Sequence, residues 1–148
     1  MTESAPSKRE QLRQERRRQI LEAALAVFTQ KGYHATNVSD VAAQAGVSQG
    51  TIYWYFESKD ELFQAAILLA FEDFGEAALG SLDQYPTATE KLTAMARAME
   101  QFADVAEGIF MLFLSYWASS EQREESAQIW IELLQEYKGV VVAVIDEG

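Results

Sequence analysis

Residues 38–62, VSDVAAQAGVSQGTIYWYFESKDEL, constrain the fold more than any other part of the chain. Apolar residues at helical spacing occupy 38–45, and Gly46 follows as a residue that can end a helix with a positive φ. Ser48 can then cap a second short helix over 49–55. Two short helices joined by a tight turn predict a helix-turn-helix motif.

The second of these helices offers few apolar side chains to a core. Ile52 and Phe56 can anchor it, whereas its other side chains are aromatic or form hydrogen bonds. A short helix that keeps such groups at its surface is typical of the recognition helix of the motif, which enters the major groove of DNA. The pattern therefore indicates a DNA-reading surface.

A helix expected over 10–31 precedes the motif, because apolar residues repeat at helical spacing up to the ending Lys31-Gly32. Its first turns carry three consecutive arginines, Arg16, Arg17 and Arg18. These could form a solvated helix end. Their position just before a helix-turn-helix makes contact with DNA phosphates an equal alternative.

The rest of the chain also reads as helices. Ser58 and Glu61 can form a capping box that opens a long helix reaching residue 82, before the break at Tyr85-Pro86. Three more helices are expected over 88–103, 107–119 and 121–148. The chain is therefore expected to be all-α, with a three-helix head joined by the long helix to a helical body.

We expect two domains. Residues 1–62 would form an N-terminal arm and the helix-turn-helix head, and residues 63–148 a ligand-binding and regulatory body. The formal net charge is −11, which is unfavourable for a nucleic-acid-binding protein. However, residues 1–60 contain eight Lys or Arg against seven Asp or Glu, whereas residues 61–148 contain four against sixteen. We therefore expect the acidic body to face away from the duplex.

Several classes of protein are not supported by the sequence. The chain has no cysteine, and its one histidine, His34, has no partner ligands at useful spacing, so we expect no metal site. No nucleophile elbow or phosphate-cradling loop occurs, so we expect no enzyme and no cofactor. No apolar run approaches the length of a membrane span, and we expect a cytoplasmic protein.

The body is rich in aromatic side chains. Ordinary core packing can explain any one of them, but as a group, with three methionines nearby, they exceed what a small body needs. Flat aromatic walls and soft methionines suit a broad apolar pocket. The candidate ligand-binding residues are Phe102, Phe110, Phe113, Tyr116, Trp117, Trp130 and Tyr137.

The run KGYHATNVSDVAAQAGVSQGTIYWYFESKDEL, led by ILEAALAVFTQKG, closely resembles the tetracycline-repressor (TetR) family of bacterial transcription regulators. The resemblance covers residues 16–70, and beyond them only the all-helical character is shared. The positions that fit the family pattern without gaps are Gly46, Val47, Ser48, Gly50, Thr51, Tyr53, Tyr55, Phe56, Lys59 and Leu62.

This resemblance implies a homeodomain-like head in a homodimer, most simply a repressor, that reads a pseudo-palindromic operator in double-stranded DNA. It also implies that a small apolar or amphipathic effector in the body releases the DNA. The implied groove contacts are Gln49, Gly50, Thr51 and Trp54, and the cap Ser48 is a further candidate DNA-binding residue. The implied phosphate contacts are Thr36, Tyr53, Tyr55 and Lys59.

Family members usually end in two long helices that form the dimer. The present sequence stops at Gly148, where a seventh helix would be ending. We therefore expect the dimerisation helices to be absent, which would weaken the dimer. The alternative function is that of a truncated interaction module, which pairs with an intact regulator and does not bind DNA by itself.

Overall fold

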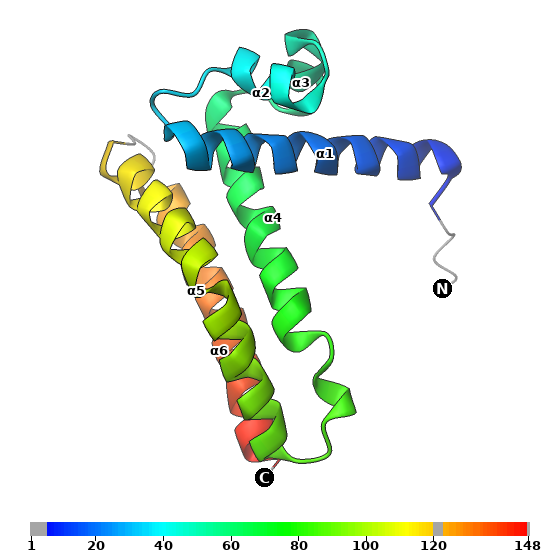
Figure 1. Ribbon diagram of the computed structural model, residues 1–148, viewed down its shortest axis with the longest axis vertical. Coiled ribbons are helices and arrows are strands. Elements are labelled where there is room, and N and C mark those ends of the chain that lie inside the picture. Colours follow the sequence, from blue (N-terminus) through cyan, green and yellow to red (C-terminus); the bar gives the residue numbers. More distant parts are fainter. Residues whose placement is uncertain (1–5, 120–122, 148) are drawn as a thin grey trace. The chain divides into compact units, whose positions relative to one another are not determined.

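The computed structural model of the chain describes residues 6–119 and 123–147. These residues form helices and contain no strand, so the all-α class is confirmed (Figure 1). The elements in order are α1 (Lys8–Lys31), α2 (Val38–Ala45), α3 (Gln49–Tyr55), α4 (Lys59–Leu79), the 3-10 helix η1 (Leu82–Gln84), α5 (Ala88–Ser119) and α6 (Arg123–Asp146). In the described helices, no stretch is both long and apolar enough to cross a membrane.

The chain divides into two compact units, Met1–Ile67 and Leu68–Gly148. The division falls within α4, somewhat beyond the expected boundary at residue 62. In the first unit, α2 packs against α1, and α3 packs against α2 (Figure 1). The fully buried side chains at the centre of this unit come from every helix: Ile20, Leu21, Phe28, Val41, Ile52, Phe56, Leu62 and Phe63.

Two aromatic rings join the ends of the first unit. Phe28 of α1 meets Phe63 of α4 edge to face, with ring centroids 5.0 Å apart. Both side chains are almost completely buried. An edge-to-face pair adds about 0.5–1.5 kcal/mol to the burial of the rings themselves, so this contact helps to fix α1 on the first turns of α4.

Helix α1 begins two residues before the expected start at residue 10. Its cap is Ser7, whose backbone N–H donates to Glu10 Oε2 at 2.8 Å, while the backbone N–H of Glu10 donates to Ser7 Oγ at 3.3 Å. This reciprocal capping box satisfies two N–H groups that would otherwise lack partners at the helix start. All side chains from Lys8 to Gln19 are exposed, including the arginines.

In the second unit, the two helices expected over 88–103 and 107–119 are one continuous helix, α5. The expected break was wrong because neither a proline nor another helix-ending signal interrupts the segment between the two expected helices. Ile109, Leu112 and Tyr116 are buried at helical spacing on the second half of α5. Thr87 caps the helix start, since its hydroxyl oxygen accepts from the backbone N–H of Glu90 at 3.2 Å.

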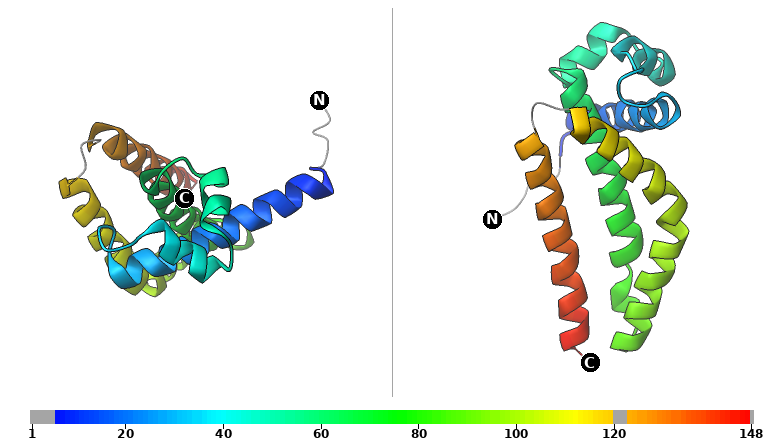
Figure 2. Two further views of the ribbon diagram at one scale, coloured as in Figure 1. Left: turned by 90° about the horizontal axis from the view of Figure 1, so that it is seen from above. Right: turned by 90° about the vertical axis from the view of Figure 1, so that its left-hand side faces the viewer.

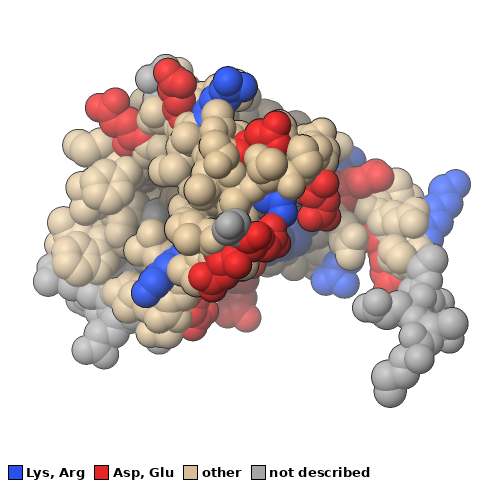
Figure 3. All heavy atoms as spheres, turned by 90° about the horizontal axis from the view of Figure 1, so that it is seen from below, with Lys and Arg blue, Asp and Glu red and all other residues tan. Residues whose placement is uncertain are grey.

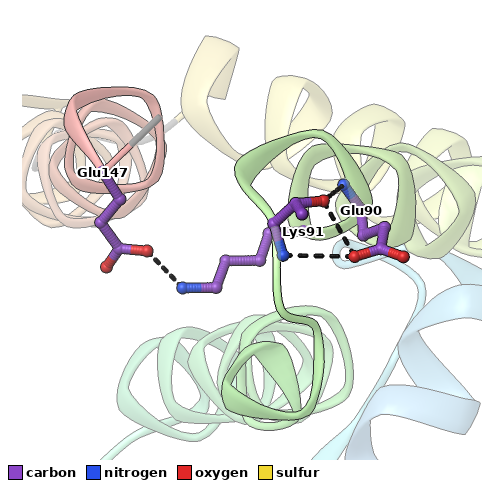
Figure 4. A network of polar contacts seen from close by, with 4 residues as sticks. Glu90, Lys91 and Glu147 are labelled. Carbon is purple, nitrogen blue, oxygen red and sulfur yellow. Dashed lines mark hydrogen bonds and ion pairs between the residues drawn. The ribbon is translucent and has the colours of Figure 1, made fainter.

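Helices α5 and α6 pack in antiparallel directions (Figure 1, Figure 2). Near the start of α5, Met95 is buried together with Leu82 of η1 and Val144 of α6. Lys91 of α5 also forms an ion pair with Glu147, just after α6 (Figure 4). At this end of the second unit, both apolar packing and an ion pair hold α6 against the start of α5.

Helix α4 ends at Leu79, three residues before the expected end at residue 82. Gly80 follows, and its backbone N–H donates to the carbonyl oxygen of Glu76 at 2.8 Å. A Cβ atom at this position would lie 2.5 Å from that same oxygen, so no larger residue fits without a backbone shift. The close approach explains why the helix ends at a glycine.

Candidate DNA-binding surface

The helix-turn-helix forms where the sequence predicted it, with helices at Val38–Ala45 and Gln49–Tyr55. Gly46 has φ 67° and ψ 34°, in the left-handed region that favours glycine. The backbone N–H of Thr51 donates to Ser48 Oγ at 3.1 Å, so Ser48 caps α3 as expected. These local features set the angle at which α3 leaves the turn.

Most of the predicted groove contacts lie together on the exposed surface of α3. Ile52 is only 1% exposed and anchors the helix, whereas Tyr53 and Trp54 are 50% and 64% exposed. Gln49 and Gly50 are also exposed, at the start of the helix. Helix α3 therefore exposes both hydrogen-bonding groups and aromatic rings. Apart from Ile52, it has little contact with the core.

Two further candidates on this helix, Thr51 and Tyr55, are half-buried. The hydroxyl groups of Ser48 and Thr51 lie 2.8 Å apart and share a hydrogen bond. The ring of Tyr55 meets that of Trp54 edge to face, with centroids 4.8 Å apart. These contacts orient side chains on the surface of α3 and leave part of each accessible.

One residue of this surface was missed by the sequence analysis. The guanidinium carbon of Arg13 lies 4.8 Å from the centroid of the Trp54 ring. One turn later on α1, the guanidinium carbon of Arg17 lies 5.3 Å from the Phe56 ring centroid. The spacing of four residues between Arg13 and Arg17 was visible in the sequence. Which aromatic ring each arginine contacts depends on how α1 packs against α3, which the sequence does not show.

The three consecutive arginines of α1 differ in their surroundings. All are exposed. Arg17 lies over Phe56, as described above, whereas Arg18 Nε forms an ion pair with Glu22 Oε1 at 3.0 Å on the same helix. Both partners of that pair are about half exposed, so the pair adds little to stability.

Thr36 has a partner within the first unit. Its side chain is completely buried, and its hydroxyl donates to the carbonyl oxygen of Gly32 at 2.7 Å. In the DNA-free chain this hydroxyl therefore has a partner within the protein, and contact between Thr36 and a phosphate stays a prediction. The sequence placed Thr36 correctly near the start of α2, but it could not show that the hydroxyl turns back toward the end of α1.

Lys59 has an unexpected set of partners. Its Nζ donates to the carbonyl oxygens of Tyr33 and Thr36, both at 3.0 Å, and lies 4.3 Å from the Tyr33 ring centroid. The hydroxyl of Tyr33 donates in turn to Asp60. The first turn of α4 therefore holds the connection between α1 and α2. Contact between Lys59 and a phosphate stays a prediction.

A second contact joins α1 to α2. Lys31 Nζ lies 3.1 Å from Asp40 Oδ1, and the backbone N–H of Asn37 donates to Asp40 Oδ2 at 2.9 Å. The hydrogen bond from Asn37, followed by the ion pair with Lys31, lowers the pKa of Asp40 below its usual value. The carboxylate therefore remains charged at the start of α2, where the helix dipole also favours it.

In the second unit, the candidate ligand-binding residues differ in burial. Tyr116 is buried, and the half-buried Phe102 stacks on Phe74 with ring centroids 4.2 Å apart. Phe110 and Trp117 are 54% and 40% exposed, and ligand binding by these residues stays a prediction. The segment is apolar all round, and the sequence could not show which face turns inward.

The remaining candidates divide in the same way. Phe113 and Tyr137 are half-buried, and the Tyr137 hydroxyl lies 3.1 Å from Met99 Sδ, which joins α6 to α5. The side chain of Trp130 lies outside the described residues. Within the described part of the chain, no group of three His, Asp or Glu side chains could hold a metal ion.

Acidic side chains dominate the second unit. Figure 3 looks from the end at which α6 finishes, and acidic side chains gather near the middle of the face shown. Because a duplex repels such a surface, the uneven charge favours contact with DNA through the first unit alone.

The chain is similar in sequence to known proteins. Residues 20–66 match the family model described as bacterial regulatory proteins, tetR family. The fatty acid metabolism regulator protein of Bacillus subtilis (strain 168) is 29% identical over 130 residues, which cover 88% of this chain and 66% of that protein. The HTH-type transcriptional regulator AcrR of Shigella flexneri is 38% identical over 79 residues, which cover 53% of this chain and 37% of that protein.

The fold agrees with these similarities. The crystal structure of the transcriptional regulator FadR from Bacillus subtilis, in complex with stearoyl-CoA, is matched with a TM-score of 0.65 and 30% identity. The match covers 88% of this chain and 69% of that one. The three proteins compared are all regulators by name, and not enzymes. The chain belongs to the tetR family of bacterial regulatory proteins.

Proposed function

We propose that the protein is a transcriptional regulator that binds specific sites in double-stranded DNA through α3. The observation that carries this proposal is the exposure of Gln49, Tyr53 and Trp54 on a helix anchored mainly by Ile52. A helix of this kind, held across another by a glycine turn, has the geometry that places side chains in a major groove.

The contacts divide into two kinds. Gln49, Thr51 and Trp54 would read base edges, and Gly50 would allow the backbone of α3 to approach the groove closely. The side chains that would contact phosphates are Arg16, Arg17, Arg18, Ser48, Tyr53, Tyr55 and Lys59. Phosphate contacts set position and salt dependence, whereas base contacts set sequence preference.

One head has few positive charges in excess, so a single copy would bind DNA weakly at cellular salt. We propose that the protein acts as a homodimer, with its two recognition helices about one turn of the duplex apart, 34–36 Å or a multiple of it. Such a dimer would read a pseudo-palindromic operator and, by covering it, repress transcription.

The second unit would take a small apolar or amphipathic effector that releases the DNA. Half-buried aromatic side chains such as Phe102, Phe113 and Tyr137 support an apolar environment there. The related FadR from Bacillus subtilis was crystallised with stearoyl-CoA, so long-chain acyl-CoA is the first class of effector to test. Stearoyl-CoA should lower operator affinity, whereas CoA without an acyl chain should not.

The DNA-binding proposal is tested by selecting duplexes from a random library and measuring fluorescence anisotropy over a range of salt concentrations. Gln49→Ala should lower affinity for the selected duplex and leave affinity for random duplex unchanged. Arg16→Ala should lower both, and reduce the slope of log affinity against log salt by about 0.9. Selection that enriches no sequence would contradict specific regulation.

A further inference from the structure

The contact between Arg13 and Trp54 couples α1 to the exposed surface of α3. Trp54 is 64% exposed, so it is not held by the core. The Arg13 guanidinium carbon lies 4.8 Å from the centroid of its ring, and the edge-to-face ring of Tyr55 is 4.8 Å away. A large, exposed side chain is therefore held by contacts from two helices.

Such contacts restrict the rotamers of an exposed tryptophan. A planar guanidinium stacks on an aromatic ring through cation–π attraction and still has N–H groups directed to its sides. Arg17, one turn later, contacts Phe56, which is only 2% exposed and needs no such support. The same type of contact therefore has a different consequence at Arg13, because its ring lies on the surface that would meet the DNA.

We propose that Arg13 is a positioning residue that fixes the Trp54 ring and thereby helps to set the base preference of α3. The proposal rests on the function proposed above, since it assumes that α3 reads DNA. It assigns Arg13 a role other than phosphate contact. Removing Arg13 should therefore change which bases are preferred, and not simply weaken binding to every duplex.

The first test needs no DNA. The full chain is labelled with 5-fluorotryptophan, and the Trp54 signal in the fluorine NMR spectrum is assigned by its loss in Trp54→Phe. Arg13→Ala should shift the Trp54 signal, because the ring loses its cation and gains freedom. Arg16→Ala, which removes an equal charge from the next turn, should leave that signal in place. An unchanged signal in Arg13→Ala would overturn the positioning role.

The second test measures base preference. Duplexes are selected from a random library with wild type, Arg13→Ala, Arg13→Lys and Arg16→Ala, and affinities are measured at several salt concentrations. Arg13→Ala should lower affinity for the wild-type duplex about two- to five-fold and enrich a different base at one position, with the salt slope unchanged. Arg13→Lys, which stacks less well, should fall between wild type and Arg13→Ala.

Two results would contradict the proposal. Arg13→Ala would mark a phosphate contact if it weakened all duplexes equally and reduced the salt slope by about 0.9, as expected for Arg16→Ala. If the wild type enriched no sequence, the function proposed above would fail, and the base preference with it. The fluorine spectrum would still decide whether Arg13 holds Trp54, so the two failures are distinguishable.

Discussion

Lys59 contacts Tyr33 in two ways, with its Nζ 3.0 Å from the Tyr33 carbonyl oxygen and 4.3 Å from the centroid of the Tyr33 ring. The same nitrogen donates to the carbonyl oxygen of Thr36. One side chain at the start of α4 therefore satisfies two backbone carbonyls in the connection between α1 and α2. The position of α2 on α1 depends on this connection.

Lys59→Met tests the structural role of this side chain. Methionine keeps the apolar stem but removes the donors, so two part-buried carbonyls lose a partner and the free energy of unfolding should fall by roughly 1–3 kcal/mol. Urea denaturation measures the change. The control Lys31→Met removes a surface ion pair with Asp40 and should cost less than about 1 kcal/mol.

DNA binding separates this role from phosphate contact. If Lys59 were mainly a phosphate contact, Lys59→Met would leave stability unchanged and reduce the salt slope of binding by about 0.9. Because the proposed phosphate contact adds to the structural role, we expect a loss of stability together with a salt slope reduced by about 0.9, and an unchanged slope would show that Lys59 does not contact a phosphate.

Thr36→Val removes a buried hydroxyl and keeps the shape of the side chain. The hydrogen bond to the carbonyl oxygen of Gly32 is lost, and we expect the free energy of unfolding to fall by about 1 kcal/mol. Thr36→Ser, which keeps the hydroxyl and loses a methyl group, serves as the control for packing. A variant with full stability and weaker DNA binding would show instead that Thr36 acts at the interface.

These residues show which parts of the structure the sequence could predict. The bounds of α2 and α3 follow from local signals, because Gly46 and Ser48 determine the turn with their own backbone and hydroxyl groups. The burial of Thr36 and the partners of Lys59 depend on segments that meet only after folding. Local chemistry therefore predicted the motif, and tertiary packing decided which of its polar side chains remain accessible.

The second unit was less predictable for a related reason. The segment GIFMLFLSYWA is apolar on every side, so its periodicity does not identify an inner face. Tyr116 turns inward while its neighbour Trp117 remains 40% exposed, and only the packing of α5 decides between them. Ligand binding by Tyr116 and Trp117 therefore stays a prediction.

Asp40 should make stability depend on pH. Its pKa is lowered in the folded protein, first by the Asn37 N–H and then by Lys31, so the folded state binds a proton less readily than the unfolded state. The stabilisation is therefore complete above the ordinary carboxyl pKa of about 4 and is lost as pH falls through the lowered value.

Thermal unfolding of Asp40→Asn tests the predicted direction of this pH dependence. The variant should melt at a lower temperature than the wild type at pH 7, and the difference should shrink as the pH is lowered below about 4. A difference of constant size from pH 7 to pH 3 would mean that the charge of Asp40 is not the cause.

The two glycines of the helix-turn-helix should respond to alanine in opposite directions. Gly46 has φ 67°, and an added Cβ atom would meet no atom within 4 Å, so the cost of Gly46→Ala comes from the backbone alone. We expect a loss of about 1–2 kcal/mol in the free energy of unfolding.

Gly50 is helical, and its added Cβ atom would have Ser48 Oγ at 3.9 Å, an ordinary contact. Gly50→Ala should therefore stabilise the fold by up to about 1 kcal/mol.

In DNA binding the order of the same two variants should be reversed, with Gly50→Ala the weaker of the two. The methyl group added by Gly50→Ala would project from the exposed surface of α3, where the proposed close approach of the backbone to the groove leaves no room for it. We expect Gly50→Ala to bind the selected duplex more weakly although it unfolds at a higher urea concentration. Gly46→Ala should bind normally under conditions in which it is fully folded, because its methyl group lies in the turn. If Gly50→Ala bound the selected duplex as well as the wild type does, the start of α3 would not lie against the DNA, and Gln49 would be the next residue to remove from the proposed interface.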